Sequence, residues 1–228
     1  MNRHCPGSKP RRLAAPSHDP QVMIIAVDGP TASGKGTIAK ALAVHFGLPH
    51  LDTGLLYRAV GRQMAVNGGD AEKAGDALAA CNFPDSLLDD PELRSEESGG
   101  LASRVSIHPE VRRALYQRQR AFATQPGGAV LDGRDIGTVI APEAQAKLFV
   151  VARVSARAER RFREMQASGR SVALADIATD LAARDARDAG RSTAPLVAAS
   201  DAMLLDTSDF SRDEAVAEAI RLVESRLG

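Results

Sequence analysis

Short apolar runs alternate with amphipathic stretches along most of the chain. The first run, residues 22–27 (VMIIAV), is wholly apolar and rich in β-branched residues, which is typical of a strand buried on both faces of a parallel sheet. Further strands are expected at residues 49–52, 129–132, 147–152 and 202–206. Helical patterns occur at residues 35–46, 53–67, 101–124 with a break near Pro109, 155–167, 174–189 and 213–227. This alternation predicts an α/β fold with a doubly wound, parallel sheet of about five strands.

Two segments depart from this alternation. Residues 68–100 are acidic and contain Asn82, Pro84, Pro91 and two Gly-Gly pairs, so we expect an insert with little regular structure. Residues 1–21 are polar, basic and proline-rich, and they lack the apolar core of a signal peptide. We expect them to form a disordered extension, or to reflect a start site assigned upstream of Met23. Residues 22–228 then form a single domain.

The chain is electrically neutral, with 29 Lys and Arg residues against 29 Asp and Glu residues. A neutral chain argues against a nucleic-acid or anionic-membrane binder, because such binders carry a basic excess. Only five of the basic residues are lysines, and arginine binds phosphate with a planar donor set, although an arginine-rich codon usage explains the surface arginines equally well. Cys5 and Cys81 cannot form a disulfide framework or a four-ligand zinc site. These features, and the lack of any apolar run of membrane-spanning length, predict a cytoplasmic protein.

The strongest chemical signal directly follows the first strand. Residues 29–37 read GPTASGKGT and match the pattern GxxxxGK between a strand and a helix, a context that argues against a chance glycine-rich turn. In such a P-loop the backbone N–H groups curl round a β-phosphate, and the helix N-terminus adds partial positive charge. Lys35 is expected to neutralise phosphate oxygens, and Thr37 is the candidate for the shell of a Mg²⁺ ion because Gly36 replaces the usual Ser or Thr. The predicted ATP-binding residues are Gly29, Pro30, Thr31, Ala32, Ser33, Gly34, Lys35, Gly36 and Thr37.

Three further clusters of charged residues lie where chain segments leave the carboxyl ends of strands, the side on which such sheets bind ligands. Residues 52–58 (DTGLLYR) place a carboxylate, a hydroxyl and an arginine at a strand–helix junction. Residues 132–138 (DGRDIGT) place an arginine between two carboxylates. In residues 184–191 (RDARDAGR) three arginines recur on one helix face, and Asp188 lies one turn from Arg184 and can orient it.

Each cluster also has a plain structural interpretation. Thr53 can be the N-cap of the following helix, the glycines of the second cluster can belong to a turn, and the arginine run can be a solvated salt-bridge ladder. A turn does not require an arginine between two aspartates, however. The second cluster therefore favours a ligand site most strongly.

Taken together, the blocks GPTASGKGT, LDTGLLYR, VRRALYQRQRAF, LDGRDIGTV and RDARDAGRSTAPL resemble the bacterial cytidylate kinase family of P-loop nucleoside-monophosphate kinases, in that family's order. The resemblance covers residues 22–228 apart from the insert. It implies a three-layer P-loop fold with a helical lid at about residues 153–171 and a short insert at about residues 68–100, on the side that binds the monophosphate. It also implies ATP-dependent phosphorylation of CMP and dCMP.

The resemblance further implies roles for individual residues. The acceptor phosphate is held by residues like Arg58, Arg134 and Arg191. Cytosine is recognised by residues like Thr53, Ser103, Arg112 and Asp135, with Tyr57 beside them. The sugar hydroxyls meet residues like Arg184 and Asp188. The lid arginines, which close over the ATP phosphates, are Arg157, Arg160 and Arg161, so the implied catalytic residues are Lys35, Arg134, Arg157, Arg160, Arg161 and Arg191.

The chain departs from the family pattern in three places. Thr53 stands where the family usually has Ser, which keeps the hydroxyl and adds a methyl group. Residues 68–100 are shorter than the three-stranded insert of typical bacterial members and lack its alternating strand pattern, which puts the insert's role in doubt. The N-terminal extension has no counterpart in the family.

The expected reaction needs cations more than it needs a base. A phosphate oxygen of CMP, with a second pKa of about 6, is mostly ionised at neutral pH. Mg²⁺, Lys35 and the arginines must instead cancel the repulsion between two phosphates. No histidine lies in a motif, so His45 and His50 are expected to be structural. Because water is also an acceptor, the lid should close only when CMP is bound.

Base choice follows from hydrogen-bond polarity. Asp135 can accept from the exocyclic amine of cytosine, and Arg112 can donate to the ring carbonyl. UMP presents a carbonyl where CMP has the amine, so we expect CMP and dCMP to be preferred over UMP by at least about tenfold.

Other interpretations remain open at this stage. The chain could be another P-loop kinase acting on UMP, AMP, shikimate or dephospho-coenzyme A, although the Asp and Arg clusters speak against this. A GTP-dependent switch would need an NKxD-type motif, which the sequence lacks. A non-catalytic nucleotide-binding module does not explain Lys35 and the many arginines. We expect a monomer whose partners are ATP and CMP or dCMP, with no nucleic-acid or membrane partner.

Overall fold

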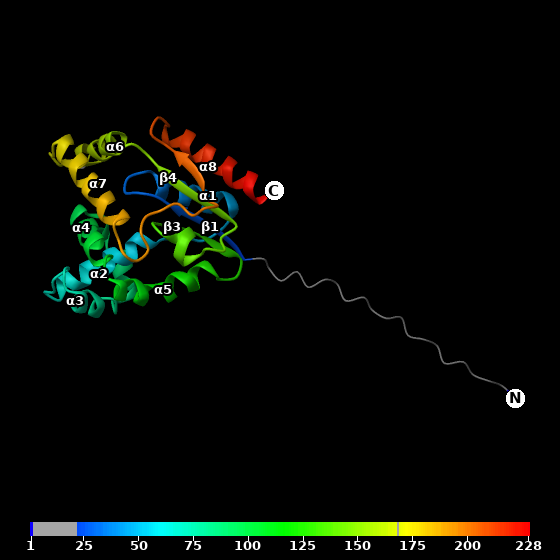
Figure 1. Ribbon diagram of the computed structural model, residues 1–228, viewed down its shortest axis with the longest axis horizontal. Helices are drawn as coiled ribbons and strands as arrows, with labels where there is room; N and C mark the ends of the chain where they lie inside the picture. The colour runs from blue at the N-terminus through cyan, green and yellow to red at the C-terminus, as the bar shows by residue number, and fades with distance from the viewer. Residues whose placement is uncertain (2–21, 168) are drawn as a thin grey trace.

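A computed structural model describes residues 22–167 and 169–228 together with Met1, so the predicted N-terminal extension lies outside the described residues. The described chain contains a five-stranded sheet with helices on both faces (Figure 1). Its strands follow the order β2-β3-β1-β4-β5 and pair in parallel throughout. They are β1 (Met23–Asp28), β2 (His50–Asp52), β3 (Gly128–Gly133), β4 (Ala146–Val151) and β5 (Met203–Asp206). The predicted parallel sheet of five strands is confirmed.

The first strand is buried on both faces, as its uniform apolar composition predicts. Ile25 and Val27 pack in one core with α1 (Lys35–Phe46) and α8 (Arg212–Leu227). Ile24 and Ala26 point to the opposite face, where they share a core with α5 (Pro109–Ala123). Because successive side chains of a strand alternate between faces, β1 joins two cores into a three-layer fold.

Residues near the helix ends explain where α1 ends and where α8 begins, in the layer that the two helices share. Helix α1 ends at Gly47, which adopts φ 65° and donates its N–H to the carbonyl groups of Ala43 and Val44. Glycine reaches this left-handed conformation without a steric cost. Helix α8 begins with a capping box, in which Ser211 and Glu214 each accept from the other's backbone N–H.

Two groups of helices lie outside the three layers, at the same end of the sheet (Figure 1). One group consists of α2 (Thr53–Val66), α3 (Ala74–Ala79) and α4 (Glu96–Val105), which pack on α5 around a separate apolar core. The other is the pair α6 (Val154–Ala167) and α7 (Leu174–Ala189), with a small core of Ala158, Ile177 and Leu181. The expected lid at residues 153–171 is centred on α6. That residues 22–228 form one domain stays a prediction.

The prediction of an irregular insert at residues 68–100 is wrong. The segment contains α3, two 3₁₀ helices, η1 (Asp85–Asp89) and η2 (Pro91–Arg94), and the start of α4. Pro91, which suggested a loop, instead occupies the first turn of η2, and Ser95 caps α4 by accepting from Ser98 N–H. Leu93 is fully buried and anchors the segment in the core around α2.

The structure also corrects the expected N-cap of α2. Asp52, not Thr53, occupies the N-cap position, and Thr53 is the first helical residue. Its hydroxyl donates to the backbone carbonyl of Asp132 at 2.9 Å, so it joins α2 to the end of β3. One element has no sequence signal that we recognised, the π-helix η3 (Ile136–Ile140) after β3. Within residues 22–167 and 169–228, no helix is both long and apolar enough to cross a membrane.

Candidate active site

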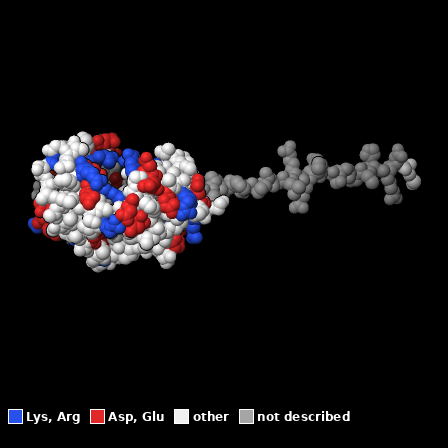
Figure 2. Space-filling view, turned by 90° about the horizontal axis from the view of Figure 1, so that it is seen from above, with Lys and Arg blue, Asp and Glu red and all other residues white. Residues whose placement is uncertain are grey.

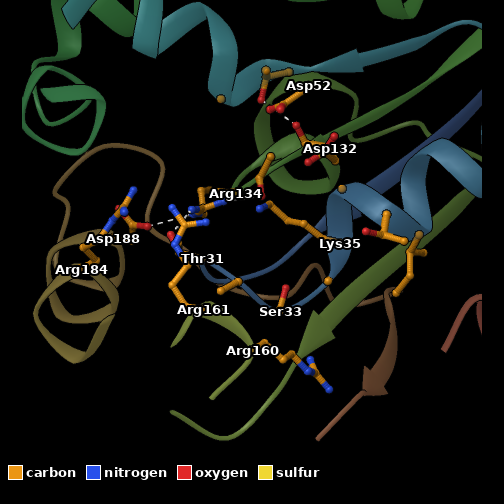
Figure 3. Close-up of a pocket in the computed structure, with 18 of the residues that line it drawn as sticks. Thr31, Ser33, Lys35, Asp52, Asp132, Arg134, Arg160, Arg161, Arg184 and Asp188 are labelled. Atoms are coloured by element: carbon orange, nitrogen blue, oxygen red, sulfur yellow. Dashed lines mark hydrogen bonds and ion pairs between the residues drawn. The ribbon is translucent and has the colours of Figure 1, made fainter. Parts of the chain in front are cut away.

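A cavity of about 640 Å³ lies where the carboxyl ends of the strands meet the P-loop and helices α4, α6 and α7 (Figure 3). Figure 2 shows Lys and Arg side chains gathered round a hollow on the face seen there. Most of the residues predicted from the sequence line this cavity. They are Thr31, Ala32, Ser33, Gly34, Lys35, Gly36, Thr37, Thr53, Tyr57, Arg58, Ser103, Arg112, Arg134, Asp135, Arg160, Arg161, Arg184, Asp188 and Arg191. Gly29, Pro30 and Arg157 are not among the lining residues.

The backbone of the P-loop has the geometry of an anion-binding loop. Gly29 adopts φ 153°, and a Cβ at this position would stand 2.1 Å from the carbonyl oxygen of Val150. Only glycine therefore allows the loop to leave β1 so close to β4. Ala32 and Gly34 also have positive φ values, 61° and 89°. Alternation of this kind turns successive N–H groups inward, which makes an anion-binding nest at the start of α1.

Lys35 is the first residue of α1 and lies in the cavity (Figure 3). Loss of contact with bulk water, and secondly the charge of Arg134, lower the pKa of its ammonium group to about 8. The carboxylates of Asp132, Asp52 and Asp188 oppose this shift. An ammonium group in this position gains from an anionic ligand, because the ligand replaces the missing solvation.

Oxygen groups that suit a hard cation also face the cradle. Thr37, Asp52 and Asp132 all line the cavity beside Lys35. Among the residues that the structure describes, no group of three His, Cys, Asp or Glu side chains gathers to hold a metal ion. This donor set fits Mg²⁺, which usually binds through one or two carboxylates together with water and substrate phosphates.

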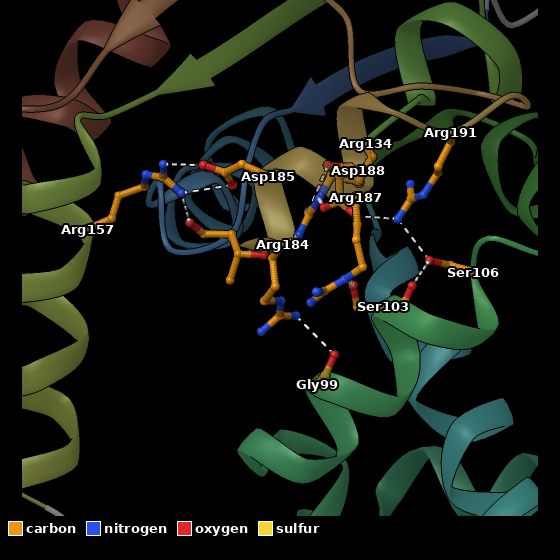
Figure 4. Close-up of polar contacts among 12 residues, drawn as sticks. Gly99, Ser103, Ser106, Arg134, Arg157, Arg184, Asp185, Arg187, Asp188 and Arg191 are labelled. Atoms are coloured by element: carbon orange, nitrogen blue, oxygen red, sulfur yellow. Dashed lines mark hydrogen bonds and ion pairs between the residues drawn. The ribbon is translucent and has the colours of Figure 1, made fainter. Parts of the chain in front are cut away.

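Arg134 connects the cradle to helix α7. Its Nη2 donates to the hydroxyl of Thr31 in the P-loop at 2.6 Å, and its Nε pairs with Asp188 at 2.9 Å (Figure 4). The second carboxylate oxygen of Asp188 pairs with Arg191. Burial alone would raise the pKa of Asp188, but Arg134 and Arg191 lower it below its usual value. The carboxylate therefore holds two arginines at the cavity wall.

The prediction of three arginines on one helix face holds only for Arg184 and Arg187, because α7 ends at Ala189 and Arg191 lies beyond it; all three still contact residues of α4 or its C-cap (Figure 4). Arg184 donates to the carbonyl of Gly99, Arg187 to the hydroxyl of Ser103 and Arg191 to the hydroxyl of Ser106, at 3.1, 3.2 and 2.8 Å. Arg184 and Arg191 are partly buried and therefore do not belong to a solvated ladder, whereas Arg187 is exposed. The prediction that Asp188 orients Arg184 is not met, because the carboxylate bonds to Arg134 and Arg191 instead.

The arginines at this wall of the cavity have more donor groups than the neighbouring protein groups satisfy. Burial, together with Arg134 and Arg58, lowers the pKa of Arg184 to about 10. The Nε atoms of Arg184 and Arg191 are buried and have no hydrogen-bond partner among the described groups. Unsatisfied buried donors of this kind are costly, so the wall favours an anionic or oxygen-rich ligand.

A buried ion pair lies deeper in the cavity. Arg112 pairs with Asp135 at 2.5 Å, and both side chains are buried. The Arg112 guanidinium also lies over the ring of Tyr57, 5.4 Å from its centroid, and burial raises the pKa of that phenol. The ring, the guanidinium and the carboxylate offer a flat ligand an apolar face, a donor and an acceptor.

The loop that carries Asp135 is held by the end of β1. Asp28 accepts from the backbone N–H groups of Ile136 and Gly137 at 2.9 and 2.8 Å. Burial raises the pKa of Asp28 to about 7, although these two N–H groups favour the ionised form. Asp28 thereby satisfies the first N–H groups of η3, which begins directly after Asp135.

The three predicted lid arginines have different surroundings. Arg157 is buried, and its guanidinium bonds to Asp185 and to the carbonyl groups of Ala152 and Thr31. In this structure it clamps α6 to α7 and the P-loop, which does not fit the expected contact with ATP phosphates. Arg160 lines the cavity and bonds to Thr207.

Arg161 and Arg58 lie at the mouth of the cavity. Arg161 forms ion pairs with Glu96 at the start of α4 and with Glu164 on its own helix. Arg58 donates to the carbonyl groups of Leu93 and Ser95 at 2.7 and 2.8 Å, on either side of Arg94. Both predicted phosphate ligands are therefore bonded to the insert in this structure.

Sequence reasoning assigned no role to several residues that line the cavity. Asp52 and Asp132 lie inside the charged clusters. Each is a carboxylate at the carboxyl end of a strand, and this position could have indicated a role in the site. Arg94 lies in the insert, which the sequence pattern did not resolve. A last group follows β5 and has no motif, although its place at the carboxyl end of a strand could have indicated it: Thr207, Phe210, Ser211, Arg212 and Ala215.

Known proteins resemble the chain over most of its length. A family model for cytidylate kinase matches residues 25–225. A cytidylate kinase of Xanthobacter autotrophicus is 53% identical over 204 residues, which cover 90% of this chain and 98% of that protein. Cytidylate kinases of Cereibacter sphaeroides and Caulobacter vibrioides are 53% and 52% identical over 202 residues each, and cover 89% and 88% of this chain.

Solved structures support the fold alone. An uncharacterized protein from Eubacterium ventriosum superposes with a TM-score of 0.51 at 18% identity, over 89% of this chain and 98% of that one. The family model and the sequence relatives are far more specific than this likeness. On their basis, and in agreement with the P-loop, DGRDIGT and RDARDAGR blocks around one cavity, the chain belongs to the cytidylate kinase family.

Proposed function

We propose that this protein transfers the γ-phosphate of ATP to CMP and dCMP, yielding ADP and CDP or dCDP. The observation that carries the proposal is one cavity of about 640 Å³ that joins a P-loop to the buried Arg112–Asp135 pair. The relatives named cytidylate kinase support the same activity.

The donor phosphates bind in the nest of residues 29–37. Backbone N–H groups surround the β-phosphate, and Lys35 neutralises charge on the β- and γ-oxygens. Residues after β5, among them Phe210 and Arg212, line the same side of the cavity and are candidates to contact the rest of ATP. Thr37 and Asp132 would hold Mg²⁺, which would supply positive charge between the phosphates.

The acceptor phosphate is opposed by arginines rather than by a base. Arg134 reaches the P-loop through Thr31 and reaches α7 through Asp188, so it lies between the two phosphate sites. Arg191 and Arg184 present buried Nε donors from the α7 side. These fixed cations cancel the repulsion between the two nucleotides and stabilise charge that spreads over the transferred group.

Cytosine is recognised at the Arg112–Asp135 pair. Asp135 accepts from the exocyclic amine, Arg112 donates to the ring carbonyl, and the hydroxyl groups of Thr53 and Ser103 lie in the same cavity. Arg184 and Asp188 are the candidates for the sugar hydroxyls. Arg160 and Arg161 lie on α6, line the cavity and are the candidates for the lid arginines, whereas Arg157 bonds α6 to the P-loop and to α7.

An acceptor panel tests the proposal. Purified protein with ATP and Mg²⁺ is offered CMP, dCMP, UMP, AMP and dephospho-coenzyme A, and ADP release is followed in a coupled assay. We expect CMP and dCMP to be preferred over UMP by at least about tenfold in kcat/KM, because UMP leaves the Asp135 carboxylate facing an acceptor. Equal use of UMP contradicts the role of Asp135, and no ADP release with CMP contradicts the proposed function itself.

A further inference from the structure

His50 lies on β2, close to the cavity, and belongs to no sequence motif. The register of β2 against β3 places His50 beside Val130 and Asp52 beside Asp132. Because side chains two residues apart on a strand share a face, His50 points to the same side of the sheet as Asp52 and Asp132. That side carries the start of the P-loop helix, where Lys35 and Gly36 lie.

The imidazole of His50 contacts Asp132 directly. Its Nε2 lies 2.7 Å from Oδ1 of Asp132, and the two side chains are 15% and 3% exposed. The other carboxylate oxygen, Oδ2, faces the cradle, since a Cβ on Gly36 would stand 3.7 Å from it. The backbone carbonyl of Asp132 accepts from the Thr53 hydroxyl. Thus β2 and the start of α2 hold the Asp132 backbone and one of its carboxylate oxygens.

Asp132 has a competing partner within the cavity. Lys35 carries its ammonium group nearby, and the charge of Asp132 raises the pKa of that group. A carboxylate free to rotate would pair with the ammonium group, and both charges would then be less available to a phosphate and its cation. A donor on the opposite side of the carboxylate prevents this rotation.

We propose that His50 is a positioning residue for the reaction. It donates from Nε2 to Oδ1 of Asp132 and keeps Oδ2 directed at the cation that accompanies the donor phosphates. This inference rests on the proposed function, in which Asp132 and Thr37 hold Mg²⁺. A second group that orients a metal-binding carboxylate typically changes metal affinity about 10–100-fold when it is removed.

Other described histidines make contacts that do not reach the cavity. His45 Nε2 lies 2.9 Å from Glu224 and joins α1 to α8 at the surface. His108 Nε2 lies 2.7 Å from the carbonyl of Ala71 and holds the insert. Among the histidines that the structure describes, only His50 contacts a side chain lining the cavity. His45 is therefore a matched control for loss of a histidine–carboxylate contact.

The test compares His50→Leu with His50→Gln, whose amide nitrogen can take the place of Nε2, and with His45→Leu. Calorimetry measures ADP affinity in excess Mg²⁺ and again in EDTA, and kinetics gives the Mg²⁺ concentration for half-maximal rate. We expect His50→Leu to reduce the Mg²⁺-dependent gain in ADP affinity by about 10–100-fold while ADP affinity in EDTA is unchanged. The Gln variant and His45→Leu should retain the gain.

Two results would overturn the inference. One is an unchanged Mg²⁺-dependent gain in His50→Leu, and the other is an equal loss of ADP affinity with and without Mg²⁺, which indicates a purely structural role. If His50→Leu does not fold, His50→Asn takes its place, because its shorter polar side chain does not reach Asp132 and must show the same loss. A wild-type protein that binds Mg²⁺ and ADP but phosphorylates no CMP contradicts the proposed function and leaves this comparison intact.

Discussion

The donor side and the acceptor side of the cavity present different kinds of chemical group. On the donor side, residues 29–37 form a cradle of backbone N–H groups whose shape depends on Gly29, Ala32 and Gly34. On the proposed acceptor side, the candidate binding groups are long arginine side chains whose terminal nitrogens already have partners, although the Nε atoms of Arg184 and Arg191 have none among the described groups. Arg134 and Arg191 pair with Asp188, and Arg58 donates to the carbonyl groups of Leu93 and Ser95.

This difference predicts two kinds of binding. The cradle is preorganised, so a triphosphate gains its contacts without breaking others. An acceptor nucleotide must instead replace internal partners, and its phosphate competes with carboxylates for the same guanidinium groups. Such exchange makes the acceptor side selective, because only a ligand that satisfies many arginines at once offsets the lost ion pairs.

The largest effect should come from removing the one cation of the preorganised cradle. Lys35→Ala is expected to lower kcat by about 10³-fold or more, because no other group takes its place on the β- and γ-oxygens. Thermal unfolding should be little changed, since the side chain lies in the cavity rather than in a core. Steady-state kinetics checks the rate, with Lys73→Ala at the edge of the insert as the control. Unchanged turnover would show that the cradle acts through its backbone alone.

A pH profile separates the two halves of the cavity. Burial lowers the pKa of Lys35 to about 8, so its ammonium group loses its charge as the pH rises above that value. We expect kcat/KM for ATP to fall about tenfold per pH unit well above pH 8, as for any single essential proton. The same parameter for CMP at saturating ATP should stay flat to about pH 9, because bound phosphates keep Lys35 protonated and the pKa of Arg184 is about 10. A common inflection in both profiles would contradict this separation.

The smallest effect should come from the ion pair at the cavity mouth. Glu96→Gln releases Arg161, and because both side chains are partly exposed, the pair is worth at most about 1 kcal/mol. Because Arg161 is a candidate lid arginine for the ATP phosphates, we expect kcat/KM for ATP to rise by at most about fivefold. The control is Glu218→Gln, which removes an exposed pair with Arg221 on α8. A fall in kcat/KM would mean that Glu96 holds Arg161 in its working position rather than competing for it.

The sequence predicted the features that depend on local chemistry. Buried strands such as β1, the P-loop and the glycine end of α1 each depend on residues close together in the chain, and all are confirmed. Residues 68–100 were misjudged because Pro91 and Ser95 occur in loops and at helix starts alike. Whether these residues start a helix depends on the buried side chain of Leu93, which packs in one core with α2, a helix far away in the sequence.

Pairing among charged side chains could not be predicted. Helical spacing placed Asp188 within reach of Arg184, but the fold brings Arg134 from another element to the same carboxylate. The family resemblance implied that Arg157 closes over the ATP phosphates, and only the packing of α6 on α7 reveals Asp185 as its partner. In the same way His50 and Asp132 are 82 residues apart in sequence, and their contact depends on strand register.

The last residue of β1 has a consequence for how the enzyme can vary. From Asp28 the chain continues into the loop for the donor phosphates, while its carboxylate holds the two amides that follow Asp135. In the proposed function, this short side chain links the loop for the triphosphate to the loop for the pyrimidine. A side chain longer by one methylene group, as in Asp28→Glu, would increase the distance between these two loops. Substrate range can therefore evolve through residues at the walls of the cavity, but not through a change in the distance between the two loops.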